Sequence, residues 1–175
     1  MTKPEFLQQV KFDQPTVFIM RGLPGSGKST LIKTLIEQSC WSCKVCSADY
    51  YWLIPDGNYN FDKSKIAQAH QYSLRGFIEA MRYASPGHII VDNTNSTINE
   101  FSHYVKIADA YDHKTVIITL NVSPETSLAR NVHNVPEKTI RNMYKRLNDT
   151  DNCLKLNAFC REHKIEQFVV DMEEI

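Results

Sequence analysis

Residues 22–30 carry the strongest chemical signal in the sequence, because they match the phosphate-binding pattern G-x-x-x-x-G-K-S/T. They are Gly22, Leu23, Pro24, Gly25, Ser26, Gly27, Lys28, Ser29 and Thr30. Glycines let a backbone wrap a phosphate chain, and N–H groups at a helix N-terminus bind the anion. We expect Lys28 to reach the β- and γ-phosphates and the Ser29 hydroxyl to ligate Mg²⁺. The motif follows a β-type run and precedes a helical one, so we predict ATP or GTP binding.

Two aspartates follow short apolar runs and are candidates for metal binding and proton transfer. Asp92 ends the run Ile89–Val91 as a Walker B carboxylate does, which would place it beside the Mg²⁺ of a phosphate loop. Asp49 lies 21 residues after Lys28, an interval that fits one helix and one strand, so it should reach the same sheet edge. There Asp49 could accept the proton of a hydroxyl that attacks the γ-phosphate. For both residues the alternative is a plain turn aspartate.

Alternating strand and helix patterns must position these residues. Five short runs are almost continuously apolar, as strands buried on both faces of a parallel sheet are. These runs are residues 16–20, 44–47, 88–91, 115–120 and 167–170. Apolar residues recur every three or four positions in 62–83, 98–111 and 136–147, which predicts helices. The order predicts a three-layer α/β fold of the P-loop NTPase or kinase type, with a five-stranded parallel sheet.

The same patterns predict one domain, residues 1–175, because no linker or repeat interrupts them. We expect residues 1–14 to be a loosely held arm. Residues 122–150 should form a lid and the helix that follows it. Residues 130–149 of this segment are net +3, which suits a lid that closes over a triphosphate.

The motifs follow one another in a set order along the chain. They are GLPGSGKST at 22–30, SADYYW at 47–52, GNYNF at 57–61, AH at 69–70, VDNTN at 91–95 and RNVHNVP at 130–136. From about Phe18 to Leu147 the chain thereby resembles P-loop phosphotransferases of the phage-type 5′-hydroxyl polynucleotide kinase family. The resemblance implies ATP-dependent transfer of the γ-phosphoryl group to a 5′-hydroxyl end of DNA or RNA, a nucleic acid repair reaction. It also puts Asp49 at the position of the general base.

The resemblance further marks a substrate side and a lid. Trp52 stands where the phage kinase has an arginine for the substrate phosphate, and Asn93 where it has the aspartate that supports this arginine. Trp52 could instead stack on a base. The substrate-binding residues that we expect are Asp49, Trp52, His70, Asn93 and Asn95. In the lid we expect Arg130 to contact the phosphates or the adenine, with His133 second, and a solvated charged face is the alternative.

Several of these residues also have a purely structural interpretation. His70 falls on the apolar stripe of its helix, where a buried core histidine is as good an interpretation as a substrate contact. The aromatic residues of segment 50–61 could stack on bases or close the core. Cys40, Cys43 and Cys46 resemble half of a metal site, but no second closely spaced pair exists, so we expect ordinary thiols.

Composition narrows the partners and the compartment. The 175 residues carry 20 Lys and Arg against 20 Asp and Glu, and this net charge of zero excludes a protein that coats nucleic acid by long-range attraction. No run approaches the ~18 apolar residues of a membrane span, and residues 1–14 lack a secretory signal. We therefore expect a cytoplasmic protein with no membrane partner.

Two other functions stay open at this point. The first is a kinase of a nucleoside, a sugar or another small hydroxyl compound, for which Asp49 would serve equally well. The second is an ATP-binding regulatory or interaction protein, which would use residues 22–30 but transfer no phosphoryl group. The sequence leaves open the oligomeric state and the choice between DNA and RNA.

Overall fold

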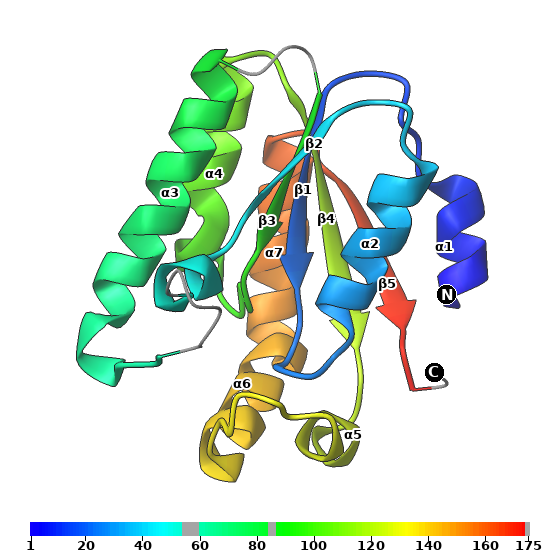
Figure 1. Ribbon diagram of the computed structural model, residues 1–175. Helices are drawn as coiled ribbons and strands as arrows, with labels where there is room; N and C mark the ends of the chain where they lie inside the picture. Colours follow the sequence, from blue (N-terminus) through cyan, green and yellow to red (C-terminus); the bar gives the residue numbers. More distant parts are fainter. Residues whose placement is uncertain (54–59, 84–86, 174–175) are drawn as a thin grey trace.

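The computed structural model describes residues 1–53, 60–83 and 87–173, and a twisted parallel sheet forms its middle layer (Figure 1). The strands are β1 (Thr16–Arg21), β2 (Cys43–Cys46), β3 (His88–Asp92), β4 (Lys114–Asn121) and β5 (Glu166–Asp171). They lie in the order β2-β3-β1-β4-β5, and every pair is parallel. Each predicted run is a strand to within one residue at either end, which confirms the five-stranded three-layer α/β fold.

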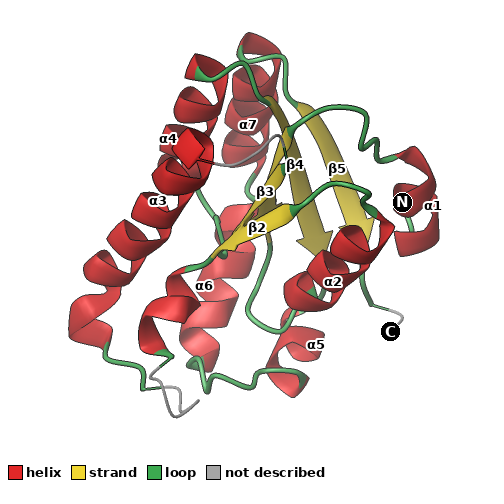
Figure 2. Ribbon diagram, turned by 45° about the horizontal axis from the view of Figure 1, so that its top comes forward, coloured by secondary structure: helices red, strands yellow, loops and turns green. Residues whose placement is uncertain are grey.

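Helices cover both faces of the sheet (Figure 2). On one face lie α1 (Lys3–Gln9) and α2 (Lys28–Gln38), whose apolar side chains join the core that contains Phe18 and Ile90. On the other face lie α3 (Ile66–Tyr83), α4 (Ile98–Ala110) and α7 (Thr150–Glu162), which pack on the core that contains Val17 and Ile89. Successive strand residues thus enter opposite cores, which explains the continuously apolar runs.

The N-terminal segment is the main difference from the expected architecture, because residues 1–14 are not a loosely held arm. Thr2 and Glu5 form a capping box at the start of α1, and the Met1 carbonyl accepts a hydrogen bond from the Asp171 N–H at 2.8 Å. Phe6 is 0% exposed and its ring lies 5.1 Å from that of Phe168. Val10 is buried in the same core, so apolar packing and backbone hydrogen bonds together tie the segment to the edge of the sheet beside β5.

Short elements gather at the carboxyl ends of the strands. They are the 3₁₀ helices η1 (Ala48–Trp52) and η2 (Lys63–Lys65), and the helices α5 (Pro124–Ala129) and α6 (Glu137–Asn148). Met20 of β1 pairs with Asp92 of β3, and Cys46 of β2 pairs with Val91. The loops after β1, β2 and β3 consequently begin side by side, at the edge where open α/β sheets bind ligands.

The described helices are also relevant to membrane association. Within residues 1–53, 60–83 and 87–173, none has both the length and the apolar character needed to cross a bilayer.

Candidate active site

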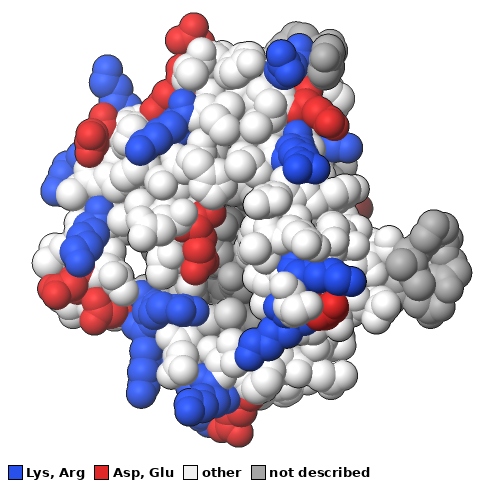
Figure 3. Space-filling model, turned by 90° about the vertical axis from the view of Figure 1, so that its left-hand side faces the viewer, with Lys and Arg blue, Asp and Glu red and all other residues white. Residues whose placement is uncertain are grey.

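A cleft of about 750 Å³ opens at the carboxyl edge of the sheet. The phosphate loop and the start of α2 form one wall, η1 and the start of α3 a second, and the segment 130–143 the third. Figure 3 shows a face of the molecule on which Lys and Arg surround a hollow with acidic side chains in its wall. The cleft has the size of a small-molecule site. It brings together the phosphate loop, Asp49 and the predicted lid.

The phosphate loop has the backbone geometry that its glycines predict. A Cβ on Gly25, whose φ is +71°, would come within 2.8 Å of the Ser127 carbonyl oxygen, so only glycine lets the loop pass this close to α5. The Ser127 hydroxyl donates to the Pro24 carbonyl at 2.6 Å and fixes the loop from the same side. Gly27 is the N-cap of α2 and has no side chain to cap it, which leaves the first N–H groups of the helix to an anion.

Lys28 points back along the phosphate loop. Its Nζ donates to the Gly22 carbonyl at 3.1 Å and to the Leu23 carbonyl at 2.8 Å. Burial lowers the pKa of Lys28, whereas the charges of Asp92 and Asp49 act to raise it. Among the described residues, the hydrogen bonds of the Lys28 ammonium group go to these two carbonyls, which it can exchange for phosphate oxygens.

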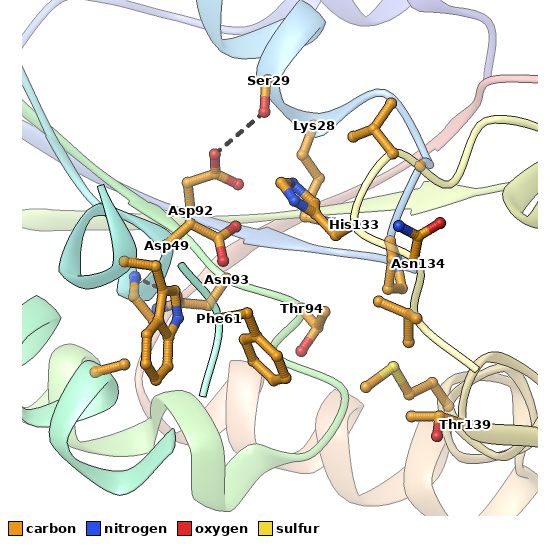
Figure 4. Close-up of a pocket in the computed structure, with 18 of the residues that line it drawn as sticks. Lys28, Ser29, Asp49, Phe61, Asp92, Asn93, Thr94, His133, Asn134 and Thr139 are labelled. Atoms are coloured by element: carbon orange, nitrogen blue, oxygen red, sulfur yellow. Dashed lines mark hydrogen bonds between the residues drawn. The ribbon is translucent and has the colours of Figure 1, made fainter. Parts of the chain in front are cut away.

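Asp92 lies directly opposite the start of α2, as Figure 4 shows. The Ser29 hydroxyl donates to Asp92 Oδ2 at 3.5 Å, a long contact. Burial raises the pKa of Asp92, Asp49 raises it further, and Lys28 opposes both. The pair offers a carboxylate and a hydroxyl oxygen, which are hard ligands of the kind that Mg²⁺ takes. The residues present therefore fit the predicted ion.

Asp49 is held at the cleft by residues that directly follow β2 and β3. Its N–H donates to the Ser47 hydroxyl at 3.2 Å, and the preceding N–H, that of Ala48, donates to Asn93 Oδ1 at 2.9 Å. Asp49 itself is exposed and lines the cleft. In Figure 4 the carboxylates of Asp49 and Asp92 and the ring of His133 point toward one space. This space adjoins the phosphate loop, as a general base would require.

The two predicted substrate asparagines differ from each other. Asn93 lines the cleft but is 8% exposed, and its amide holds η1 and reaches Ser73 Oγ at 3.5 Å. Asn95 is 1% exposed, donates to the Met20 carbonyl at 2.7 Å, and does not line the cleft. The expectation that Asn95 binds substrate is therefore wrong, because its buried amide is hydrogen-bonded to the backbone near the end of β1.

The aromatic side of the cleft also differs from expectation. Trp52 is 5% exposed, since the rings of Tyr51 and Phe61 lie 4.9 and 5.2 Å from it. A buried Trp52 cannot offer a free face to a base. Phe61, which the sequence placed only within an aromatic segment, lines the cleft and is exposed. Residues 57 and 59 of that segment lie outside the described residues.

His70 is exposed in the cleft, so its interpretation as a core histidine is wrong. In its first turns α3 buries Ala69 and Ser73 instead, so its buried face lies one residue before His70. The buried face coincides with the predicted apolar positions only at Phe77. Ala and Ser carry too little apolar surface to reveal this face in the sequence.

In the predicted lid, the charged group of Arg130 is not turned toward the phosphate loop as expected. Arg130 borders the cleft, but its guanidinium donates to the carbonyls of Met172 and Glu173 at 3.0 and 3.1 Å. His133 is exposed and lines the cleft. The turn around it is closed by Asn131, whose amide donates to the Val135 carbonyl at 2.8 Å and accepts from the Val135 N–H at 3.2 Å. Apart from the polar type of Asn131, nothing in the sequence pattern indicates these two amide hydrogen bonds.

The cysteines of the C-x-x-C-x-x-C segment do not converge. Cys43 packs against the core that α1 and α2 cover, and Cys46 lies in the core on the opposite face. Burial raises the pKa of the Cys46 thiol to about 11. Among the residues that the structure describes, no cluster of three or more His, Cys, Asp or Glu side chains is arranged to hold a metal ion.

Sequence comparison links the chain to larger proteins. Residues 17–149 match the family model of an AAA domain, AAA_33. The chain is 32% identical over 130 residues to human NEDD4-binding protein 2, an alignment that covers 71% of this chain and 7% of that protein. It is 31% identical over 123 residues to mouse 2′,3′-cyclic-nucleotide 3′-phosphodiesterase, covering 70% and 27%. The chain thus covers 27% or less of the length of these two relatives.

Structural comparison identifies the same kind of fold in several solved proteins. The RNA repair complex Pnkp1/Rnl/Hen1 contains a chain with a TM-score of 0.63 and 19% identity, over 82% of this chain and 47% of that one. AvrRxo1-ORF1:-ORF2 with ATP gives 0.62 and 16%, over 89% and 55%. A gluconokinase from Sinorhizobium meliloti gives 0.54 and 15%, over 95% and 86%. At these identities the likeness establishes the P-loop kinase-like fold.

Proposed function

This chain belongs to the AAA domain family, and on that premise we propose that it is an ATP-dependent kinase acting on a 5′-hydroxyl end of DNA or RNA. The family and the relatives together support a phosphotransferase or phosphoesterase with a nucleotide-binding P-loop. The observation that carries the finer proposal is the position of Asp49, which faces the same cleft as the phosphate loop. Simple nucleotide binding does not require a carboxylate on that wall.

The proposed division of the cleft follows its walls. The N–H groups of residues 22–30 and Lys28 would hold the triphosphate. Ser29 and Asp92 would hold Mg²⁺, which when bound neutralises charge on the phosphate oxygens. His133 and Arg130 belong to the lid, residues 122–150. Arg130 would contribute only by exchanging the two tail carbonyls for phosphate oxygens.

The proposed reaction uses Asp49 as the proton acceptor. The acceptor hydroxyl oxygen forms a bond to the γ-phosphorus, while the bond from this phosphorus to the β–γ bridging oxygen breaks. ADP leaves with the electron pair of that bond, and the hydroxyl proton passes to the Asp49 carboxylate. The product is a 5′-phosphate end.

The experiment incubates the protein with γ-labelled ATP, Mg²⁺ and a 5′-hydroxyl oligonucleotide, with DNA and RNA in separate reactions. We expect labelled oligonucleotide, and we expect Lys28→Ala to abolish it because the triphosphate loses its cation. Lys106→Ala, an exposed lysine of α4, is the matched control and should label normally. If the wild type labels neither nucleic acid, the proposal is wrong.

A small hydroxyl compound is the second candidate acceptor. The cleft of about 750 Å³ lies within the usual range of small-molecule sites, which favours this candidate. Competition decides between the two: if a nucleoside or a sugar suppresses oligonucleotide labelling at far lower concentration, the small compound is the substrate. If ATP binds but no acceptor is labelled, the chain is instead an ATP-binding regulatory or interaction protein.

A further inference from the structure

The wall of the cleft beside Asp49 carries one exposed aromatic ring. Phe61 is 52% exposed, and its only recorded ring partner among the described residues is Trp52, at 5.2 Å and an interplanar angle of 61°. An edge contact of this kind covers only part of the ring. Figure 4 shows Phe61 among the residues that line the cleft. The Asn60 N–H donates to the Trp52 carbonyl at 3.0 Å, which fixes the chain directly before the ring.

A cation lies two residues farther along the same wall. Lys63 begins η2 and lines the cleft. The nearby Asp62 carboxylate accepts from the Ser64 N–H and hydroxyl and pairs with Lys65 at 3.4 Å. Within the described residues Lys63 itself has no ion pair, so Asp62 does not neutralise it. An aromatic face and an uncompensated cation therefore flank the cleft on its Asp49 side.

We propose that Phe61 and Lys63 form a nucleotide-recognition subsite for the acceptor, in which Phe61 stacks on the terminal base and Lys63 binds the first phosphate beyond it. A nucleotide end offers both a planar ring and a phosphate, whereas a sugar offers neither. The subsite rests on the proposed kinase function and deepens it. It also replaces the stacking role that the sequence assigns to Trp52, whose ring is covered.

A design that combines one substitution in the protein with one change in the acceptor tests the stacking step. Acceptor oligonucleotides with a normal or an abasic 5′-terminal residue are compared in wild type and Phe61→Ala. We expect Phe61→Ala to raise KM for the normal acceptor about tenfold, within the range for one stacked base. The KM for the abasic acceptor should not change, because no base is present to lose. Phe61→Trp should restore the wild-type KM, and Tyr111→Ala is the matched control, because Tyr111 is a 45% exposed aromatic residue at the C-cap of α4.

A second comparison tests the cation. The acceptors carry either a normal or an uncharged methylphosphonate linkage after the first nucleotide. Lys63→Ala should raise KM three- to fivefold for the normal acceptor only, an effect on the order of one exposed ion contact. Its salt slope for single-stranded acceptor should fall by about 0.7. Lys65→Ala is the control, because that lysine already pairs with Asp62.

The outcomes separate the subsite from the kinase function. If the wild type phosphorylates oligonucleotides but Phe61→Ala has the KM of Tyr111→Ala, the subsite is wrong and the kinase stands. Equal KM increases for normal and abasic acceptors would also overturn it, since a packing defect affects both. If the wild type labels a sugar and no oligonucleotide, both proposals fall together.

Discussion

Asn93 should act as a brace for Asp49, the proposed general base, and removing the Asn93 amide tests that role. Its Oδ1 accepts the Ala48 N–H at 2.9 Å, directly before Asp49, and its Nδ2 reaches Ser73 Oγ at 3.5 Å. Ser73 also accepts the Tyr104 hydroxyl at 3.1 Å. Asn93→Ala removes both contacts of a side chain that is itself 8% exposed. Losing the hydrogen bonds of such a buried amide costs roughly 1–3 kcal/mol.

Two assays separate this bracing role from the substrate contact that the sequence predicts. For about 2 kcal/mol the melting temperature should fall by about 4–8 °C in a chain of this size. A displaced Asp49 should also lower kcat by tenfold or more while KM for ATP stays unchanged. Asn99→Ala, an exposed asparagine on α4, should stay within about 0.5 kcal/mol. A raised acceptor KM with wild-type stability and kcat would refute the brace.

Three further predictions address the rest of the molecule. Phe6→Ala should lower the free energy of unfolding in urea by about 3–5 kcal/mol, whereas a loosely held arm would give almost no change. With a pKa of about 11, Cys46 should resist iodoacetamide at pH 8 while the exposed Cys40 reacts, as peptide mass spectrometry would show. Burial lowers the pKa of His88 from 6.5, and its neutral ring accepts the Thr16 N–H. The contribution of His88 to stability should therefore be complete above about pH 6.5 and fall as the pH drops toward the folded-state pKa, in urea titrations that His88→Gln flattens.

The sequence was sufficient to predict where the chemistry gathers. Strand ends are marked by apolar runs, and parallel strands bring their carboxyl ends to one edge. The positions of Lys28, Asp49 and Asp92 at one cleft follow from this rule together with the spacing of the motifs. An apolar run shows where a strand ends, and for these three residues the strand end determines their position.

The errors arose where tertiary contacts decide. Trp52 is buried because Tyr51 and Phe61 pack on it, and no local pattern shows which of three neighbouring aromatics stays exposed. Arg130 donates to carbonyls more than 40 residues away, at the end of the chain. The N-terminal segment packs through contacts such as the ring of Phe6 on Phe168 of β5, which lies near the other end of the sequence. Contacts between residues that are far apart in the chain leave no periodic pattern in the sequence.

The most direct test of the account is the rate of phosphoryl transfer by Asp49→Asn. The substitution keeps the shape of the side chain but removes the carboxylate that takes the proton. We predict that the wild type labels a 5′-hydroxyl oligonucleotide from γ-labelled ATP, and that Asp49→Asn lowers kcat by about 10²–10⁴ with ATP affinity unchanged. Asp112→Asn, at an exposed turn, should match the wild type. Wild-type kcat in Asp49→Asn would contradict the central claim that this residue is the general base.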